Sequence, residues 1–481
     1  MIALAVLASC GSYDRNPASA RPSTTTRSQF ATPTGSANST STTTRSGGSS
    51  TTTRPSGTTT RPGASTSTAS TTRPALNPAA ALPRLPGRLA IIDGQGRLVV
   101  TQPNGTAAAP IATASQGEIS HPTWSPDASK LVWSATSPVG AQVATAAVAT
   151  PTSAVAITLT EAAPTFFTWR PPAGRTALGV PTTTAAPAAT ARVAWSRTTD
   201  DKTDLGVLDL TAGATSRTLF SDSPVYFSLS PDGTRAIVRS GQADLVVVDL
   251  DTAVATRLAV QAADFETPVW LENNSVLLAV QTSDGSFLSI VDATTGRRQD
   301  LLRYEGTIQF VVDQSGQRIA YQVNSGGGGG INPAKGPLLQ APTAPTTTVP
   351  TATIGRLSLF ERRNNTNRTI LDNAVLAFAW SPGSDRIAFL AQASGGLVQW
   401  RFWTDQAIES SVLFQPSPAA LQYIQAFTQN DQSTRWFSPD GHAFVFSGKV
   451  ADLDGVWVQV LDGFGPPARV SDGSLAVWSP Q

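Results

Sequence analysis

The sequence is poor in the residues on which most site chemistry depends. It contains one cysteine, one methionine and two histidines, and only 14% of its residues are charged. A single cysteine excludes an intramolecular disulfide framework and a cysteine-based zinc site, and two histidines leave little material for metal coordination or a catalytic triad. The 34 basic and 33 acidic residues give a net charge of +1, which excludes a global polyelectrolyte attraction to nucleic acid. We therefore expect no nucleic-acid partner, no metal and no cofactor.

The N-terminus combines an apolar run with the only cysteine. Residues 2–8 are apolar, and the small residues Ala8 and Ser9 stand directly before Cys10. This arrangement resembles the lipobox of bacterial lipoproteins, in which the cysteine thiol receives a diacylglyceryl group and the small residues give signal peptidase access to the backbone. A signal peptide is ordinarily about 15–30 residues long and begins with basic residues. We therefore interpret residues 1–9 as the remnant of one and expect the true start to lie upstream.

The alternative to lipid attachment is an ordinary apolar N-terminus with a chance cysteine. A transmembrane anchor is not an alternative, because a spanning helix needs about 20 apolar residues and no stretch of the sequence supplies them. Without the lipid, the sequence predicts a soluble or secreted protein.

Residues 10–85 are dominated by Thr, Ser, Ala, Pro, Gly and Arg. The tetrapeptide T-T-T-R recurs at 24–27, 42–45, 51–54 and 58–61. Such a segment cannot bury enough apolar surface to offset the entropy of ordering it, so we expect a disordered tether. Nine arginines against the single Asp14 give residues 1–88 a charge of +8, so the rest of the chain carries −7 of the total of +1. The arginines either lie near anionic lipid headgroups or wall polymers, or only keep the tether solvated.

From residue 86 onward, one phrase recurs: an apolar residue, then Ser-Pro-Asp-Gly or a degraded copy of it, then a β-rich run. The copies begin at Trp124, Trp169, Leu229, Trp270, Val312, Trp380, Phe437 and Trp478. Successive copies are 45, 60, 41, 42, 68, 57 and 41 residues apart. Because Pro fixes φ and Gly supplies a positive φ in such a turn, each copy predicts two strands joined by a tight hairpin.

Further segments alternate apolar and polar residues with the period of a β-strand. They are Asp204–Leu210, Asp244–Leu250, Phe287–Asp292, Gly355–Phe360 and Gly455–Leu461. Four antiparallel strands in about 40–45 residues are typical of a propeller blade, and we expect no helix to compete with them. The W-S-P-D-G phrase at this spacing resembles the repeats of TolB-type β-propellers, relatives of the WD-repeat architecture. The resemblance covers residues 86–481 and implies an all-β propeller that takes part in protein–protein interaction within a cell-envelope assembly.

The ends of the chain predict how the ring closes. The last phrase is preceded by only one strand, Ser474–Trp478, whereas three strands lie before the first phrase, at Arg88–Ile92, Arg97–Thr101 and Ala109–Thr113. Joining them completes a blade and removes an exposed sheet edge, which gives eight blades. Seven is the alternative if the Trp169 region or the last strand is irregular. Two Pro-, Thr- or Gly-rich inserts, at about 181–190 and 324–353, are expected to be disordered loops.

An acidic residue stands four to eight residues before every copy of the phrase. The acids are Glu118, Glu161, Asp222, Glu266 (with Asp264 beside it), Glu305, Asp372, Asp431 and Asp472. Because this window precedes the innermost strand of each blade, it maps to one mouth of the central channel. The pattern predicts an electronegative ring that attracts a cation, a basic protein segment or a cationic small molecule. The alternative is that connecting loops simply collect Asp and Glu as turn formers.

No motif for catalysis stands out. There is no G-x-S-x-G nucleophile elbow, and the five consecutive glycines at 326–330 lack the rest of a phosphate-binding loop. His121 and His442 are interpreted as structural residues rather than as bases or metal ligands. The D-x-D-G sequence at Asp452–Gly455 lacks the further ligands of a calcium loop.

The sequence therefore predicts a lipid-anchored, monomeric propeller on the extracytoplasmic face of a bacterial cell membrane. It would act as a binding or scaffold module that recognises an envelope protein or a small ligand at a channel mouth, and we expect no enzymatic activity. The competing hypothesis is a propeller enzyme of the glycosidase, lyase or lactonase type with an acid-lined channel site. Loop acids alone do not define the carboxylate pair that such chemistry requires.

Overall fold

The computed structural model describes the chain from residue 76 to residue 481, with gaps. The gaps are 114, 116, 139, 160–165, 170–191, 200–201, 211–213, 224, 242, 266, 325–349, 351 and 431–434. Cys10, the tether, the insert at 181–190 and most of the insert at 324–353 therefore lie outside the described residues. No helix in the described part is long and apolar enough to cross a membrane.

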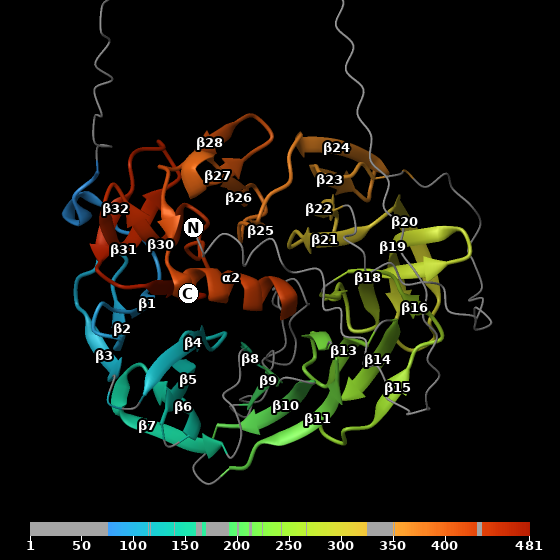
Figure 1. Cartoon of the computed structure of the whole chain (residues 1–481), viewed down its shortest axis with the longest axis horizontal. Coiled ribbons are helices and arrows are strands. Elements are labelled where there is room, and N and C mark those ends of the chain that lie inside the picture. The colour runs from blue at the N-terminus through green and yellow to red at the C-terminus, as the bar shows by residue number, and fades with distance from the viewer. Residues whose placement is uncertain are drawn as a thin grey trace, which may run out of the picture. The chain divides into compact units, whose positions relative to one another are not determined.

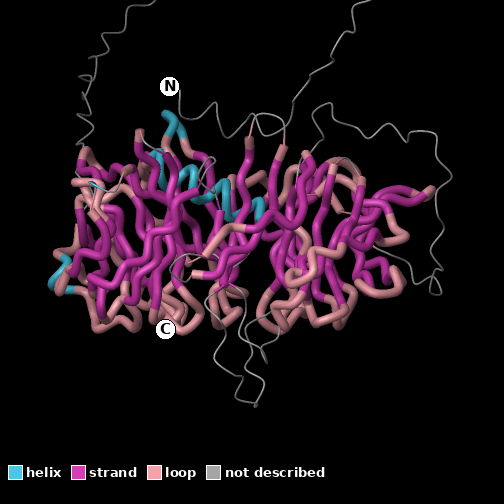
Figure 2. Tube along the Cα trace, turned by 90° about the horizontal axis from the view of Figure 1, so that it is seen from below, coloured by secondary structure: helices cyan, strands magenta, loops and turns pink. Residues whose placement is uncertain are grey.

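The described residues from β1 onward form eight sheets arranged in a ring around a central channel, as Figure 1 shows. In blades 1 to 7 the chain runs through four antiparallel strands from the channel outward and then passes to the next blade. The all-β propeller and the count of eight blades are confirmed, and the alternative of seven is not. The side view in Figure 2 shows the strands running between two faces of the ring.

The first four blades follow one another in the order of the chain. Blade 1 is β4 (Glu118–Trp124), β5 (Lys130–Ser137), β6 (Gly140–Ala147) and β7 (Thr150–Leu159). Blade 2 is β8 (Phe166–Trp169), β9 (Arg192–Thr198), β10 (Thr203–Asp209) and β11 (Arg217–Asp222). Blade 3 is β12 (Val225–Leu229), β13 (Arg235–Ser240), β14 (Asp244–Asp249) and β15 (Ala255–Arg257). Blade 4 is β16 (Gln261–Ala262), β17 (Val269–Trp270), β18 (Ser275–Thr282), β19 (Gly285–Asp292) and β20 (Arg298–Tyr304), and its inner strand is split between β16 and β17.

The remaining blades continue around the ring. Blade 5 is β21 (Thr307–Val312), β22 (Arg318–Asn324), β23 (Leu357–Glu361) and β24 (Thr366–Leu371). Blade 6 is β25 (Ala377–Trp380), β26 (Ile387–Gln392), β27 (Val398–Trp403) and β28 (Ile408–Ser410). Blade 7 is β29 (Gln415–Pro416), β30 (Ala443–Val450), β31 (Leu453–Val460) and β32 (Ala468–Ser471). Blade 8 joins the two ends of the propeller: β33 (Leu475–Trp478), β1 (Leu89–Ile92), β2 (Leu98–Thr101) and β3 (Ala109–Ala112).

Blade 8 closes the ring as the sequence predicts. Its inner strand β33 pairs antiparallel with β1, with Trp478 opposite Leu89 and Leu475 opposite Ile92. The side chain of Trp478 is fully buried and its indole N–H donates to the carbonyl oxygen of Pro86 at 2.9 Å. The C-terminal strand therefore holds the N-terminal strands in place and covers the inner edge of β1.

The Ser-Pro-Asp-Gly phrases form the tight turns between the first and second strands. In blade 3, Gly233 has a φ of +65° and its N–H donates to the carbonyl oxygen of Ser230. The Asp232 carboxylate accepts from the Ser230 hydroxyl at 2.5 Å and from the Thr234 N–H at 3.0 Å. Burial alone would raise the pKa of Asp232, but these hydrogen bonds hold it below its usual value. The conformation of the turn is thus determined by its own residues, so the turn can be predicted from the sequence.

The tryptophan that opens a phrase connects neighbouring blades. Its indole N–H donates to a carbonyl oxygen of the preceding blade's inner strand: Trp124 to Val477, Trp169 to Thr123, Trp270 to Ser228 and Trp380 to Val311, at 3.0–3.4 Å. Arginines of the preceding blade stack on some of these rings, with Arg318 4.6 Å from the ring centre of Trp380. The repeated tryptophan therefore stabilises the ring between blades as well as within them.

Blade 7 contains a helix that the sequence patterns did not indicate. Its inner strand stops after β29, and helix α2 (Pro418–Asn430) follows before the strand resumes near Phe437. Ser417 caps the helix, because its hydroxyl accepts from the Ala420 N–H at 3.1 Å, and Pro418 occupies the first helical position. α2 crosses the centre of the ring in Figure 1 and contacts the inner strands β8 and β12 of blades 2 and 3.

Candidate functional site

We call the face where the chain passes from the outer strand of one blade to the inner strand of the next the connection face. Five of the predicted acids are described, and all five lie at such passages: Glu118, Asp222, Glu305, Asp372 and Asp472. The other three, Glu161, Glu266 and Asp431, lie outside the described residues. The Ser-Pro-Asp-Gly turns and the C-terminus lie at the opposite face, toward the bottom of Figure 2.

Three of these acids have partners within the protein. The Asp222 carboxylate accepts from the Ser240 hydroxyl and, at 2.8 Å, from the Ser223 N–H. Asp372 forms an ion pair with Arg356 at 3.1 Å. Asp472 accepts from the Gly94 N–H at 3.3 Å. The oxygens of these three acids are therefore engaged within the protein.

Glu118 and Glu305 are different. Both are exposed, and neither side-chain carboxylate forms a hydrogen bond or an ion pair with any residue in the described part of the chain. They are carried by blades 1 and 5, which stand on opposite sides of the ring in Figure 1. Across the described ranges, no group of three or more His, Cys, Asp or Glu side chains is placed to hold a metal ion. The described acids therefore share one face without converging on a single cation site.

Asp264, next to the predicted acid of blade 4, belongs to a network that spans three blades. Its carboxylate accepts from the Thr307 hydroxyl of blade 5 at 2.5 Å and from Arg239 of blade 3 at 3.3 Å. Its carbonyl oxygen accepts from the Tyr304 hydroxyl at 3.1 Å, and burial raises the pKa of that tyrosine. Arg239, only 7% exposed, also donates to the carbonyl oxygen of Phe265 at 2.5 Å. The connection face is thus held rigidly between blades 3 and 5.

The two histidines have separate environments. His121 lies at a bulge in β4 with a φ of +54°, and its Nδ1 is buried without a hydrogen-bond partner. Burial lowers the pKa of His121 to about 4, so its imidazole is neutral at neutral pH. His442 places its Nδ1 2.6 Å from Asp462, and Asp462 also accepts from Arg386 of blade 6 at 2.7 Å. His442 thus takes part in a contact between blades 6 and 7.

The D-x-D-G segment forms part of a hairpin. Asp452 has a φ of +70° in the turn between β30 and β31, and Asp454 lies 3.6 Å from Lys449 across the same hairpin. Gly455 pairs with Gly448 two positions further along the hairpin than Leu453 with Val450. In the described structure, the segment therefore forms the turn and the first pairs of this hairpin.

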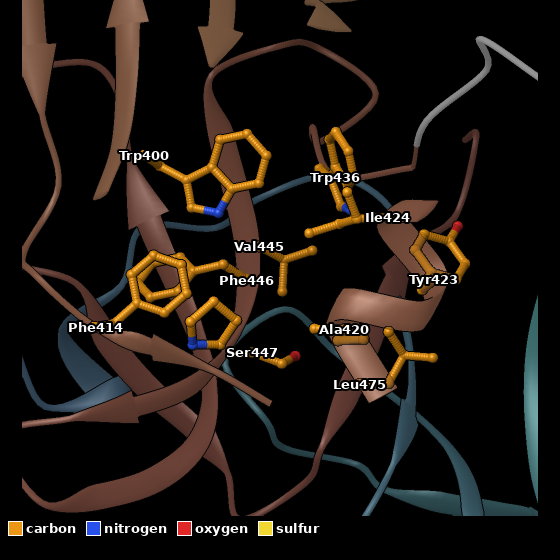
Figure 3. Close-up of a pocket in the computed structure, with 12 residues that line it drawn as sticks. Trp400, Phe414, Ala420, Tyr423, Ile424, Trp436, Val445, Phe446, Ser447 and Leu475 are labelled. Carbon is orange, nitrogen blue, oxygen red and sulfur yellow. The ribbon is translucent and has the colours of Figure 1, made fainter. Parts of the chain in front are cut away.

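A small cavity lies beneath α2, and sequence reasoning missed it. Its volume is about 20 Å³, enough for one water molecule. Figure 3 shows aromatic side chains from blades 6 and 7 around it, with Ala420, Tyr423 and Ile424 of α2 closing one side. Ser447 lines the cavity and its buried hydroxyl has no hydrogen-bond partner. The only sequence signal was the Ser417-Pro418 helix start.

The ring of eight four-stranded sheets defines the class of this protein as an eight-bladed β-propeller. No protein-family model matches the chain, and no curated protein matches its sequence. Among solved structures, TolB from Acinetobacter baumannii is 10% identical, with 67% of this chain and 62% of TolB covered and a TM-score of 0.34. The chain thus spans less than two thirds of that structure. The similarity is one of fold.

Other solved propellers are similar at the same level. An oligogalacturonate lyase in complex with manganese is 12% identical, with 74% of this chain and 86% of the lyase covered and a TM-score of 0.39. The β-propeller domain of the Trilobed protease from Pyrococcus furiosus is 11% identical, with coverage of 74% and 98% and a TM-score of 0.40.

Proposed function

We propose that this chain is a lipid-anchored, extracytoplasmic propeller that binds a basic protein segment of the cell envelope on its connection face, and that it acts by binding rather than by catalysis. We infer the binding face from the exposure of two carboxylates, those of Glu118 and Glu305. Both carboxylates are exposed on that face without a partner in the described part of the chain. Unpaired surface carboxylates attract cationic groups and increase the rate of encounter with a basic partner.

The charge distribution supports a basic partner. The propeller side of the chain carries −7, against +8 before residue 89. Asp222 and Asp472, whose partners are uncharged, add negative potential on the same face, whereas the charge of Asp372 is offset by Arg356. The network of Arg239 and Asp264 holds Tyr304 and Thr307 on either side of Glu305, which lowers the entropic cost of binding at that residue.

Attachment to a membrane is part of the proposal and rests on the sequence. Cys10 follows an apolar run and small residues, and the residues 11–85 that follow it are long enough to hold a propeller away from a lipid surface. Fractionation of cells that produce the full chain and its Cys10→Ser variant tests this part. We expect the native chain in the membrane fraction and the variant in the soluble fraction; a variant that remains in the membrane refutes the lipid anchor.

The binding face is tested with the double variant Glu118→Gln/Glu305→Gln and an oligolysine peptide as the probe. Each exposed charge contributes roughly 0.2–1 kcal/mol, so we expect the double variant to weaken binding about two- to thirtyfold at low salt, with a smaller difference at high salt. The matched control is Glu272→Gln, an exposed acid in a turn of the opposite face. Equal loss in the control and the double variant would show that only the total charge matters.

A further inference from the structure

The segment that interrupts blade 7 is inserted between two parts of an inner strand whose pairing with β30 is otherwise complete. Before it, Pro416 pairs with Gly448, and the Ser417 N–H donates to the carbonyl oxygen of Ser447 at 3.2 Å. After it, the Val445 N–H donates to the carbonyl oxygen of Trp436 at 2.8 Å. One position of β30 therefore remains between the two parts of the inner strand.

Arg435 fills that position. Continuing the register back from Trp436 places Arg435 opposite Phe446, directly after Ser417 in the pairing. The Trp478 N–H donates to the carbonyl oxygen of Arg435 at 2.8 Å, so this residue also takes its place against blade 8. Residues 418–434 are thus additional to a complete inner strand, and joining Ser417 to Arg435 would leave every pairing position of β30 in register.

The inserted helix has the composition of a helix that is packed inside a protein. The sequence of α2, P-A-A-L-Q-Y-I-Q-A-F-T-Q-N, contains no charged residue. The helix contacts β30 and β33 on its own side of the ring and β8 and β12 across the channel. An isolated helix of this length is marginal in water, so α2 depends on these contacts for its stability.

The surface beneath α2 is apolar and buried, and a small cavity interrupts its packing. Trp400, Phe414, Trp436 and Phe446 present their rings there, with Trp400 and Trp436 5.0 Å apart and Phe414 and Phe446 4.7 Å apart. We call this surface, lined by Trp400, Phe414, Trp436, Phe446 and Ser447, the seat of α2. The cavity of about 20 Å³ means that α2 does not fill the seat completely. Ser447 is only 3% exposed, and its hydroxyl has no hydrogen-bond partner among the described residues of this apolar surrounding.

We propose that α2 is a plug that leaves its seat while the propeller stays folded, and that the exposed seat binds a small molecule with an apolar ring and one hydrogen-bonding group for the Ser447 hydroxyl. The incomplete packing and the unpaired hydroxyl both reduce the free energy needed to move α2 away. Aromatic walls with a single polar group are typical of small-molecule sites. This site is separate from the connection-face acids, and neither proposal depends on the other.

Thiol labelling tests the movement of the plug. In a Cys10→Ser background, which removes the only native cysteine, Ser447→Cys reports opening beneath α2. Ser289→Cys is the control, because Ser289 is fully buried in blade 4 away from α2. Without denaturant, we expect a thiol reagent to label Ser447→Cys at least tenfold faster than Ser289→Cys. Equal rates would mean that α2 opens only when the whole propeller unfolds, and would overturn the proposal.

Weakening the plug sharpens this measurement in the full chain. Tyr423→Ala/Ile424→Ala removes side chains that α2 places against the seat, so labelling of Ser447→Cys should rise further. Gln422→Ala changes an exposed position of the same helix and should leave the rate unchanged. A rise in the Gln422→Ala control as large as in the double variant would contradict the assigned seat.

The ligand class is tested by deleting residues 418–434, with phenol as the probe. We expect the deletion variant to fold cooperatively and to bind phenol at least tenfold more tightly than the full chain does. Toluene, which lacks the hydroxyl, should bind more weakly than phenol, and Ser447→Ala should remove that difference. A deletion variant that does not fold refutes the separate plug, and a folded one that binds no phenol refutes the site.

Discussion

Trp270 of blade 4 donates its indole N–H to the carbonyl oxygen of Ser228 in the inner strand of blade 3, 3.0 Å away. Arg235 of blade 3 lies over the same indole, 5.5 Å from its ring centre. The Trp270 side chain thus donates a hydrogen bond to a carbonyl oxygen of blade 3 and stacks its ring against an arginine of the same blade. Because Trp124, Trp169 and Trp380 make the same hydrogen bond in their blades, the contact recurs around the ring.

This contact predicts that Trp270→Phe destabilises the propeller beyond its loss of volume. The variant removes a buried hydrogen bond worth about 0.5–1.5 kcal/mol and leaves the Ser228 carbonyl oxygen without this donor. The control is Trp133→Phe, since Trp133 is equally buried but its indole N–H has no partner. Denaturant unfolding should show the larger loss for Trp270→Phe. The interpretation fails if Trp133→Phe costs as much.

The repeated phrases could be recognised in the sequence because each turn is determined by residues next to one another in the chain. Ser230, Asp232 and Gly233 fix their own turn, so four consecutive letters carry the information. The closure of blade 8 was predictable for a related reason: the unassigned strands at the two ends had no other partner. In contrast, the hydrogen bond from Trp270 to Ser228 depends on how two blades meet, which no local pattern contains.

The acids and α2 show where the sequence stops being informative. A window before each phrase finds Asp222 and Glu118 alike, but only side-chain geometry shows that Asp222 is bound to Ser240 whereas Glu118 is exposed without a partner in the described chain. α2 was missed because its residues interrupt a strand between two repeats that were each recognised. Its start, Ser417 followed by Pro418, is a readable helix signal when considered alone.

Asp462 links blades 6 and 7 and predicts a dependence of stability on pH. The hydrogen bond from Arg386 holds the pKa of Asp462 below its ordinary value of 3.8, with a further contribution from His442. A lowered pKa in the folded state stabilises the protein above pH 3.8, and this stabilisation is lost as the pH falls through the lower folded-state pKa. Asp462→Asn should therefore destabilise at pH 7, by less than about 1 kcal/mol because the carboxylate is half exposed.

Urea unfolding of Asp462→Asn and the native chain between pH 7 and pH 3 checks this. The difference between the two should be constant at neutral pH and should shrink below pH 3.8. A difference that persists at pH 3 would mean that packing, not the ionised carboxylate, explains the effect of the substitution.

Gly206 is required for space rather than for backbone freedom. It lies at a register shift in β10, and a Cβ there would clash with the indole ring of Trp195 and stand 2.8 Å from the carbonyl oxygen of Arg217. Since Trp195 is buried, Gly206→Ala should cost about 1–3 kcal/mol through overpacking. Gly383→Ala, whose added carbon would meet only the flexible carboxylate of Asp385, should change the free energy of unfolding by less than about 0.5 kcal/mol. Similar costs for both would exclude the steric explanation.

Trp478 controls the closure of the ring. Its ring is fully buried in the strand that pairs with β1, and its indole N–H donates to the carbonyl oxygen of Pro86. Trp478→Ala should lower the free energy of unfolding by about 3–5 kcal/mol, as for other buried large-to-small changes. Because β33 holds the N-terminal strands, amide exchange should also accelerate in β1 before it does in blade 4. Gln481→Ala, which removes only an exposed hydrogen bond to the carbonyl oxygen of Pro126, is the control and should change the free energy of unfolding by less than about 0.5 kcal/mol. Uniform acceleration across all blades would show that closure and global unfolding are one event.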